Sequence, residues 1–147
     1  MEVADKEINY ERLLRKLKSH EGFRQFPYKC PAGYLTIGYG RNLETKGITR
    51  EEAEILLLND VKEVEKQLRQ KLPFFNKLSS VRKEVLINMA FNLGINGLMK
   101  FKRMLHELEH EDYDKASEEM KDSKWYHQVK NRAKELVYAM KYNKYPY

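Results

Sequence analysis

Apolar side chains recur at helical spacing near the start of the chain and predict its first element. The positions are three and four residues apart: Tyr10, Leu13, Leu14 and Leu17. The predicted helix ends around residues 20 to 22, where Gly22 can cap it. Glu21 lies four residues beyond Leu17, which predicts that it faces the buried side of the last turn.

The pattern changes between residues 26 and 48 to short extended pieces rich in Tyr, Thr and Ile, interrupted by Gly and Pro. This predicts a small antiparallel sheet. Thr49 followed by Glu52 forms a capping box, after which apolar residues follow one side of a helix of about twenty residues that ends before Pro73. A helix of this kind suits a connection between a sheet-bearing lobe and the rest of the chain.

The remainder is predicted to be helical. Ser80 begins a segment that is apolar on more than one side, so we expect a central core helix closed by Gly94. Further helices are expected at about 100–110, 113–121 and 131–142, with connections at 96–97, 111–112 and 123–130. The predicted fold is α+β and mostly helical, in one domain: a sheet-bearing lobe at about 20–50, a connecting helix at about 50–71 and a helical lobe at about 72–147.

Composition and charge limit the number of domains and the kinds of partner, cofactor and membrane segment that the chain can have. The 147 residues suit one domain, and a net charge of +6 weakly suggests a polyanionic partner such as nucleic acid, anionic lipid or an acidic wall polymer. Alternation of Lys and Glu on solvated helix faces explains the same charge. Cys30 is the only cysteine, so no intramolecular disulfide forms, and we expect no metal or cofactor. Residues 1–20 hold no apolar run of seven, so we expect neither a signal peptide nor stable membrane insertion.

Three residues are candidates for chemistry, although each has an ordinary explanation when taken singly. Glu21 stands at a helix C-terminus, where the helix dipole disfavours a carboxylate, as a general acid requires. A helix-end Glu is otherwise a solvated surface group. Thr36 on a strand can hold a water or a sugar hydroxyl, and Cys30 can be reactive if it is partly exposed beside a cation such as Lys29 or His20. Otherwise Thr36 is an ordinary strand residue and Cys30 a small buried hydrophobe.

Their combination resembles the phage-type lysozymes of glycoside hydrolase family 24. The family signature is a Glu, eight residues, an Asp or sometimes a Cys, five residues and a Thr, which Glu21, Cys30 and Thr36 match. Further segments resemble the family in the same order: T-I-G-Y-G, I-T-R-E-E-A-E, V-R-K-E-V-L-I-N-M-A-F-N-L-G and S-K-W-Y-H-Q-V-K-N-R-A-K. The resemblance extends from about Leu13 to Tyr142.

The resemblance implies a two-lobed α+β lysozyme-like protein with bacterial peptidoglycan as its substrate, cleaved at the β-1,4 bond between N-acetylmuramic acid and N-acetylglucosamine. It implies that Glu21 protonates the glycosidic oxygen, while Cys30 and Thr36 manage the attacking water or an intermediate. It also implies that Arg132 pairs with the acid, and that Asn42 and Phe91 contact sugar. A role for Phe91, Trp125 and Tyr126 in core packing is equally consistent with their spacing.

Cys30 replaces the Asp of many family members, and a thiol with a pKa of about 8.5 is mostly protonated at neutral pH. Its possible roles are a thiolate base acting on water, a thiolate nucleophile, or a neutral group that positions water together with Thr36. Ala32 and Lys124 replace an acidic residue and an arginine of well-known members, which puts a salt bridge there in doubt. We expect a monomeric endolysin, held in the host cytoplasm until a holin releases it to the wall.

Two other functions are compatible with parts of the sequence. A lytic transglycosylase cleaves the same bond with one catalytic Glu, which suits the missing second carboxylate but leaves the Thr36 spacing unexplained. A basic helical nucleic-acid-binding domain is suggested by 28 Lys and Arg. These are interleaved with 22 acidic residues and accompany no recognised nucleic-acid motif, so we expect no nucleic-acid partner.

Overall fold

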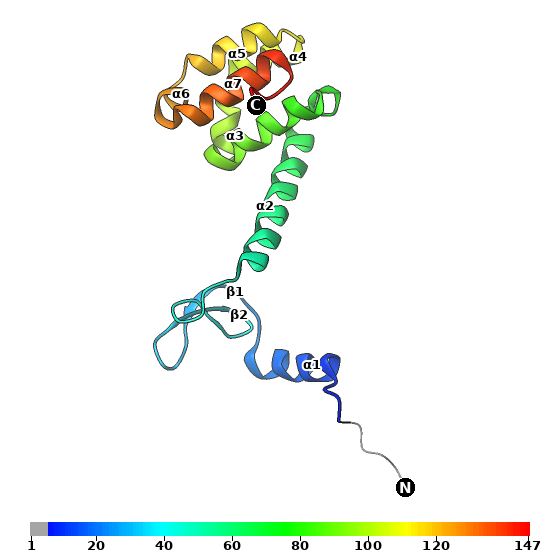
Figure 1. Ribbon diagram of the computed structural model, residues 1–147, viewed down its shortest axis with the longest axis vertical. Helices are drawn as coiled ribbons and strands as arrows, with labels where there is room; N and C mark the ends of the chain where they lie inside the picture. The colour runs from blue at the N-terminus through cyan, green and yellow to red at the C-terminus, as the bar shows by residue number, and fades with distance from the viewer. Residues whose placement is uncertain (1–5) are drawn as a thin grey trace. The chain divides into compact units, whose positions relative to one another are not determined.

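The computed structural model describes residues 6–147 and has a mostly helical α+β fold with one small antiparallel sheet (Figure 1). The chain forms two compact units, residues 1–54 and 55–147. Residues 1–5, the start of the segment in which no signal peptide is expected, lie outside the described range. Within residues 6–147, every helix lacks the length or the apolarity needed to cross a bilayer.

Helix α1 (Tyr10–Glu21) begins and ends as the sequence predicts. The Asn9 side chain caps its start by accepting a 3.0 Å hydrogen bond from the Arg12 amide. Gly22 caps its end at a φ of 71°, with its amide donating to the Lys18 carbonyl. Within the first unit Glu21 is exposed, so no element of this unit buries it as predicted. Thr36 is the only buried residue among residues 6–54, so the first unit has no apolar core to cover this helix.

The sheet has three strands, β1 (Arg24–Lys29), β2 (Leu35–Gly38) and β3 (Arg41–Asn42), paired antiparallel in the order β1-β2-β3. It lies within the stretch predicted to be extended, apart from the first two residues of β1. Thr36 is on the central strand, where it is opposite Tyr28 of β1 and Asn42 of β3. The central position buries Thr36, which is 3% exposed.

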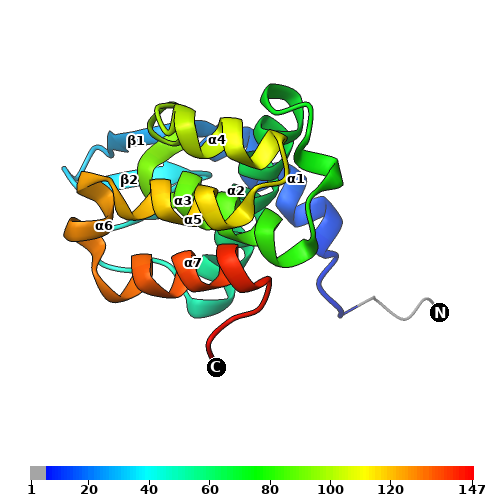
Figure 2. The same ribbon diagram turned by 90° about the horizontal axis from the view of Figure 1, so that it is seen from above.

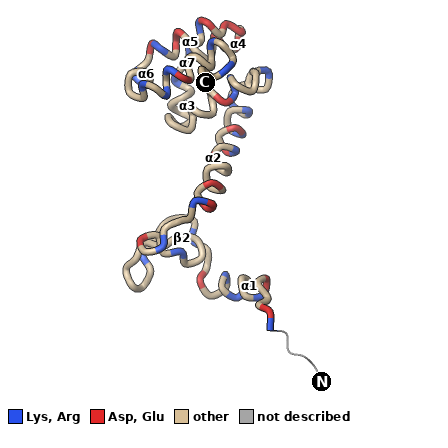
Figure 3. Tube along the Cα trace, in the orientation of Figure 1, with Lys and Arg blue, Asp and Glu red and all other residues tan. Residues whose placement is uncertain are grey.

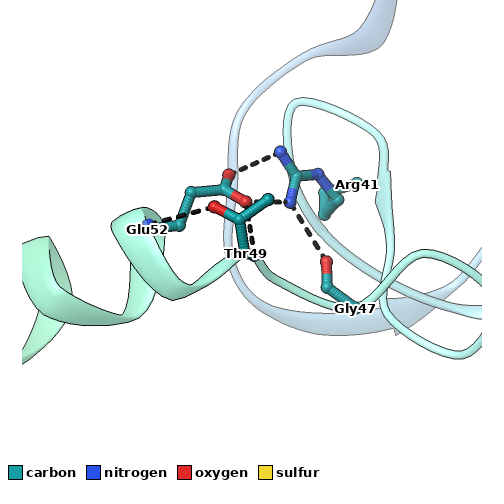
Figure 4. A network of polar contacts seen from close by, with 4 residues as sticks. All are labelled: Arg41, Gly47, Thr49 and Glu52. Atoms are coloured by element: carbon teal, nitrogen blue, oxygen red, sulfur yellow. Dashed lines mark hydrogen bonds and ion pairs between the residues drawn. The ribbon is translucent and has the colours of Figure 1, made fainter.

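Helix α2 (Arg50–Lys71) begins with the predicted capping box. The Thr49 amide donates to the Glu52 carboxylate at 2.8 Å, and the Glu52 amide donates to the Thr49 hydroxyl at 3.1 Å. Arg41 donates to both carboxylate oxygens of Glu52 and, at 3.0 Å, to the Gly47 carbonyl (Figure 4). This network joins β3, the following loop and the start of α2. It was not predicted, because Arg41 and Glu52 are eleven residues apart and belong to different elements.

The network makes the stability of the first unit sensitive to acid. The Arg41 guanidinium, followed by the Thr49 amide, lowers the pKa of Glu52 from 4.5 to about 2. A carboxylate with a lowered pKa in the folded state stabilises the fold above its unfolded pKa, and this contribution disappears as the pH falls from 4.5 towards 2. We therefore expect Glu52→Gln to lower the melting temperature at pH 7, with a difference from wild type that shrinks across that interval.

The control for this prediction is Glu51→Gln, which removes the same charge from the same first turn of α2. Thermal unfolding followed by circular dichroism from pH 7 to pH 2 measures both variants. Equal behaviour of the two variants would show that the contact with Arg41 contributes nothing beyond the general effect of a helix N-terminus on an acidic residue.

The second unit contains the apolar core. Its elements after α2 are a short 3₁₀ helix (Phe75–Lys77), α3 (Ser80–Met99), α4 (Lys102–Glu109), α5 (Tyr113–Lys121), α6 (Lys124–Val129) and α7 (Asn131–Tyr142). Helix α5 contacts both α4 and α7 and lies between them (Figure 2), while α3 and α6 also contact α7. The largest fully buried side chains come from these helices, the 3₁₀ helix and the end of α2: Leu68, Phe75, Leu86, Met89, Leu98, Met104, Leu108, Met120 and Met140.

Two predicted connections are helical in the structure. Gly94 breaks α3 with a φ of 77°, as expected of a helix end, but helical structure resumes and continues through residues 96–97 to Met99. Residues 123–130 contain α6, whose N-cap Ser123 accepts a hydrogen bond from the Tyr126 amide at 3.1 Å. Both short segments carry a buried apolar residue, Leu98 and Trp125. Core packing therefore stabilises helical turns that local sequence signals do not indicate.

Basic and acidic side chains are interspersed along α2 and the helices of the second unit (Figure 3). Several of them form exposed pairs one helical turn apart, such as Glu65 with Arg69 and Glu118 with Lys121. This is the distribution typical of solvated helix faces.

Candidate active site

Glu21 is the last residue of α1, and its carboxylate lies against the turn between β2 and β3. The close neighbour is Gly40: a β-carbon built there would lie 2.7 Å from Oε2 of Glu21. The predicted acid is therefore exposed to solvent on one side and in contact with backbone on the other. Accessibility of this kind is what a proton donor to a polymeric substrate needs.

Cys30 begins the tight turn that joins β1 to β2. The Gly33 amide donates to the Cys30 carbonyl at 2.8 Å, and the Cys30 amide donates to the Tyr34 carbonyl at 2.9 Å. Pro31 supplies the fixed φ that suits the second position of a turn, and Gly33 takes the left-handed conformation with a φ of 87°. The sequence C-P-A-G-Y thus encodes a three-residue hairpin loop that begins at Cys30.

Backbone amides favour the thiolate of Cys30. The largest cause of its lowered pKa is a hydrogen bond from the Tyr34 amide, which outweighs the opposing effect of partial burial. The Ala32 amide, the Thr36 hydroxyl and the Gly33 amide act in the same direction. The cations proposed from the sequence, at residues 20 and 29, are not among the causes. The turn itself therefore lowers the pKa of this half-buried thiol.

Thr36 connects this turn to the centre of the sheet. Its hydroxyl donates to the Tyr34 carbonyl at 2.9 Å. A threonine hydroxyl carries one hydrogen, so it donates either to the Tyr34 carbonyl, as here, or to the neighbouring Cys30 sulfur, an interaction that lowers the pKa of the thiol. The structure thus places two of the three signature residues beside each other.

Asn42 closes the loop that follows β3. Its side-chain oxygen accepts hydrogen bonds from the amides of Glu44 and Thr45, each at 3.0 Å, and its backbone carbonyl accepts from Lys46 and Gly47 at 3.2 Å. These bonds explain why an Asn suits this position. Contact of Asn42 with sugar stays a prediction. The hydrogen bonds of its side chain use the oxygen, so the amide nitrogen can donate to a sugar hydroxyl.

Phe91 and Arg132 line one hollow of about 330 Å³ in the second unit. Arg132 donates to the side chain of Asn88 at 2.8 Å and to its carbonyl at 3.2 Å, while Phe91 is 45% exposed. The other lining residues were not predicted: Leu57, Val61, Glu84, Ile87, Asn88 and Tyr145. Asn88 lies three residues before Phe91 in α3, and this spacing places both residues on one helix face. The spacing is the sequence signal from which Asn88 could have been predicted. The predicted pairing of Arg132 with Glu21 stays a prediction.

Tyr145 closes one side of this hollow. Its hydroxyl donates to Glu84 at 2.7 Å, and burial followed by the Glu84 carboxylate raises the pKa of Tyr145 to about 12. The phenol therefore stays neutral at physiological pH and keeps its hydrogen-bond donor. The hollow thus combines an exposed aromatic ring with fixed polar groups, which suits the alternating apolar and hydroxyl faces of a sugar.

Trp125 packs in the core. It is 4% exposed, its indole N–H donates to Asn92 at 2.9 Å, and its ring meets Phe101 edge-on at 6.0 Å. Tyr126 is partly buried against the same core. Of the three aromatic residues considered from the sequence, Phe91 alone presents a large exposed face.

Comparison with known proteins shows to which family the chain belongs. The family model described as phage lysozyme matches residues 18–140, which include all six predicted site residues. The chain belongs to the phage lysozyme family. It is accordingly a glycoside hydrolase of the muramidase type, acting on bacterial peptidoglycan.

Three relatives illustrate the range of the family. "Probable T4-type lysozyme 1" of Dictyostelium discoideum is 30% identical over 150 residues, which cover 82% of this chain and 88% of the relative. "Endolysin" of Acyrthosiphon pisum secondary endosymbiont phage 1 is 34% identical over 118 residues, covering 78% and 77%. "Pre-baseplate central spike protein Gp5" of Enterobacteria phage T4 is 30% identical over 149 residues, but they form only 26% of that protein.

Proposed function

We propose that this lysozyme hydrolyses the muramic acid bond with Glu21 as proton donor and the Cys30 thiolate as the base that activates water. The observation that supports this proposal is the turn at residues 30–34. Its amides and the Thr36 hydroxyl favour a negative charge on the position where many relatives of this type carry an Asp. We propose that the thiolate, stabilised by these hydrogen bonds, takes the role of the missing carboxylate as the base that accepts a proton from water.

The proposed reaction is balanced without any cofactor. Glu21 gives its proton to the glycosidic oxygen, which leaves as the 4-hydroxyl group of N-acetylglucosamine. Water adds its oxygen to the anomeric carbon of N-acetylmuramic acid, and Cys30 takes the proton that this water loses. Glu21 ends ionised and Cys30 protonated, and exchange with solvent restores both groups.

The hollow of the second unit supports the binding of the glycan. Phe91 offers an exposed ring to the apolar face of a sugar, Asn88 and Arg132 offer donors to its polar groups, and the Tyr145 oxygen, whose hydrogen is donated to Glu84, can accept from a sugar hydroxyl. We propose that these residues, together with Asn42, bind substrate without taking part in bond cleavage.

We further propose that the protein is a monomer that collects in the host cytoplasm and reaches the wall through a holin. The resemblance to endolysins supports this proposal. Size-exclusion chromatography with light scattering tests the oligomeric state. Expression with and without a holin tests the route, since culture lysis is expected only when the holin is present.

Product analysis on purified peptidoglycan tests the reaction. Mass spectrometry of fragments released by the wild type is expected to show reducing muramic acid ends, each carrying one added water. Glu21→Gln measured in parallel controls for contaminating hydrolases. Anhydro-muramic acid ends from the wild type would contradict hydrolysis and support the lytic transglycosylase alternative.

A further inference from the structure

Gly40 occupies the turn between β2 and β3 directly beside the Glu21 carboxylate. Its φ of 74° lies in the left-handed region that favours glycine. A β-carbon added there would lie 2.7 Å from Oε2, 3.1 Å from Cδ and 3.5 Å from Cγ of Glu21. Carbon does not approach an oxygen to 2.7 Å without a bond, so the present carboxylate position exists only because residue 40 lacks a side chain.

The residue before Gly40 fixes the end of α1 in this place. The ring of Tyr39 lies 5.6 Å from that of Phe23, which follows the helix. On the helix itself, the Lys18 ammonium group lies 5.8 Å from the Tyr39 ring centre. Tyr39 thus contacts residues on both sides of Glu21. The approach of Glu21 to Gly40 is therefore part of a wider contact between the helix end and the turn.

We propose that Gly40 is a positioning residue, which determines where the carboxylate of Glu21 lies. This inference rests on the proposed role of Glu21 as proton donor. Glu21 is exposed and its side chain has three rotatable bonds, so a methyl group at position 40 displaces the carboxylate more easily than it displaces backbone. The expected consequence is a loss of catalysis, because small misplacements of a reacting group can cost on the order of 100-fold in rate.

Gly38 provides a matched control two residues away. Its φ of 68° is close to that of Gly40, so alanine suffers similar backbone strain at either position. A β-carbon at Gly38 would meet nothing within 4 Å. The two alanine variants therefore differ chiefly in whether the added methyl group meets Glu21.

The kinetic test uses soluble peptidoglycan fragments as substrate. We expect Gly40→Ala to lower kcat by about 10- to 100-fold with little change in KM, and to alter the pH profile of kcat. Gly38→Ala should keep the wild-type profile and lie within about threefold of wild-type kcat, and both variants should lose similar amounts of thermal stability. Equal kinetic losses in the two variants would overturn the proposal.

A second measurement reports the contact without reference to activity. In protein labelled with ¹³C at glutamate Cδ, the Glu21 signal is assigned by its absence from Glu21→Gln. It should shift in Gly40→Ala and stay in place in Gly38→Ala. An unshifted signal in Gly40→Ala would overturn the proposal, whereas full activity of Glu21→Gln would overturn the catalytic role of Glu21 alone.

A double variant serves if Gly40→Ala does not fold. Glu21→Ala removes all three atoms that the methyl group would meet. Folding of Glu21→Ala/Gly40→Ala would then confirm that the contact is the obstacle. Failure of the double variant to fold, with Gly38→Ala folded, would show that residue 40 must be glycine for backbone reasons and would overturn the proposal.

Discussion

Replacing Glu21 with Gln is expected to reduce the rate of wall lysis by at least about two orders of magnitude, the usual contribution of a general acid. The amide has the shape of the carboxyl group but cannot give a proton to the glycosidic oxygen. Because Glu21 is exposed, the substitution buries no unpaired polar group, so the fold should persist. Clearing of a suspension of purified walls measures the rate, and thermal unfolding measures the stability.

Glu11→Gln is the matched control for this experiment. Glu11 lies in the first turn of the same helix, where it forms only an exposed 3.8 Å pair with Arg15. The control variant loses one negative charge from α1 and should keep wild-type activity. Lysis by Glu21→Gln at a rate near that of wild type would remove Glu21 from the mechanism.

Local signals predicted the elements that hold the signature residues. Gly22 after an amphipathic run marked the end of α1, and the spacing of Thr49 and Glu52 marked the start of α2. These signals are reliable because the bonds that they describe join residues at most four apart. They place Glu21 at a helix end and Cys30 on a turn before any tertiary contact is considered.

Burial and contacts between separate elements could not be predicted from such local signals. The spacing of Glu21 from Leu17 predicted burial, but burial depends on whether another element covers that face, which helical periodicity does not reveal. The bidentate pair of Arg41 and Glu52 joins separate elements. The identity of Trp125 as a core residue follows from its packing against Phe101 and α3, since a stripe of aromatic residues has the same spacing in either role.

The lowered pKa of Cys30 has a different cause in the structure from the one expected from the sequence. The sequence directed attention to charged neighbours, since cations are the familiar cause of a lowered thiol pKa. In the structure the cause is the peptide backbone of Ala32, Gly33 and Tyr34, whose amides are invisible in a list of side chains. The combination of Pro31 and Gly33 was the available signal, because it specifies a turn whose amides converge near its first side chain.

The same turn explains how two different residue types can serve at this position. Amides that stabilise a thiolate also stabilise a carboxylate, which accepts hydrogen bonds in the same direction. An Asp at position 30 would be the typical first residue of a turn closed by its own side chain. We therefore expect Cys30→Asp to fold normally and to keep substantial lytic activity.

Replacing Cys30 with Ala is expected to lower the lytic rate by about 100-fold or more, since alanine cannot accept the proton of the attacking water. A loss of only about tenfold, the cost of one modest hydrogen bond, would mean that the thiol merely helps Thr36 to position water.

Alkylation by iodoacetamide provides the second measurement of the role of Cys30. Because amides lower the pKa of Cys30, the reaction should proceed faster at neutral pH than that of an ordinary thiol, whose pKa is about 8.5. It should inactivate the enzyme at the rate at which the thiol is consumed. The active Cys30→Asp variant is the control, because it has no thiol and must resist the reagent. Full activity of both Cys30→Ala and the alkylated wild type would exclude Cys30 from catalysis and leave the role of Glu21 unaffected.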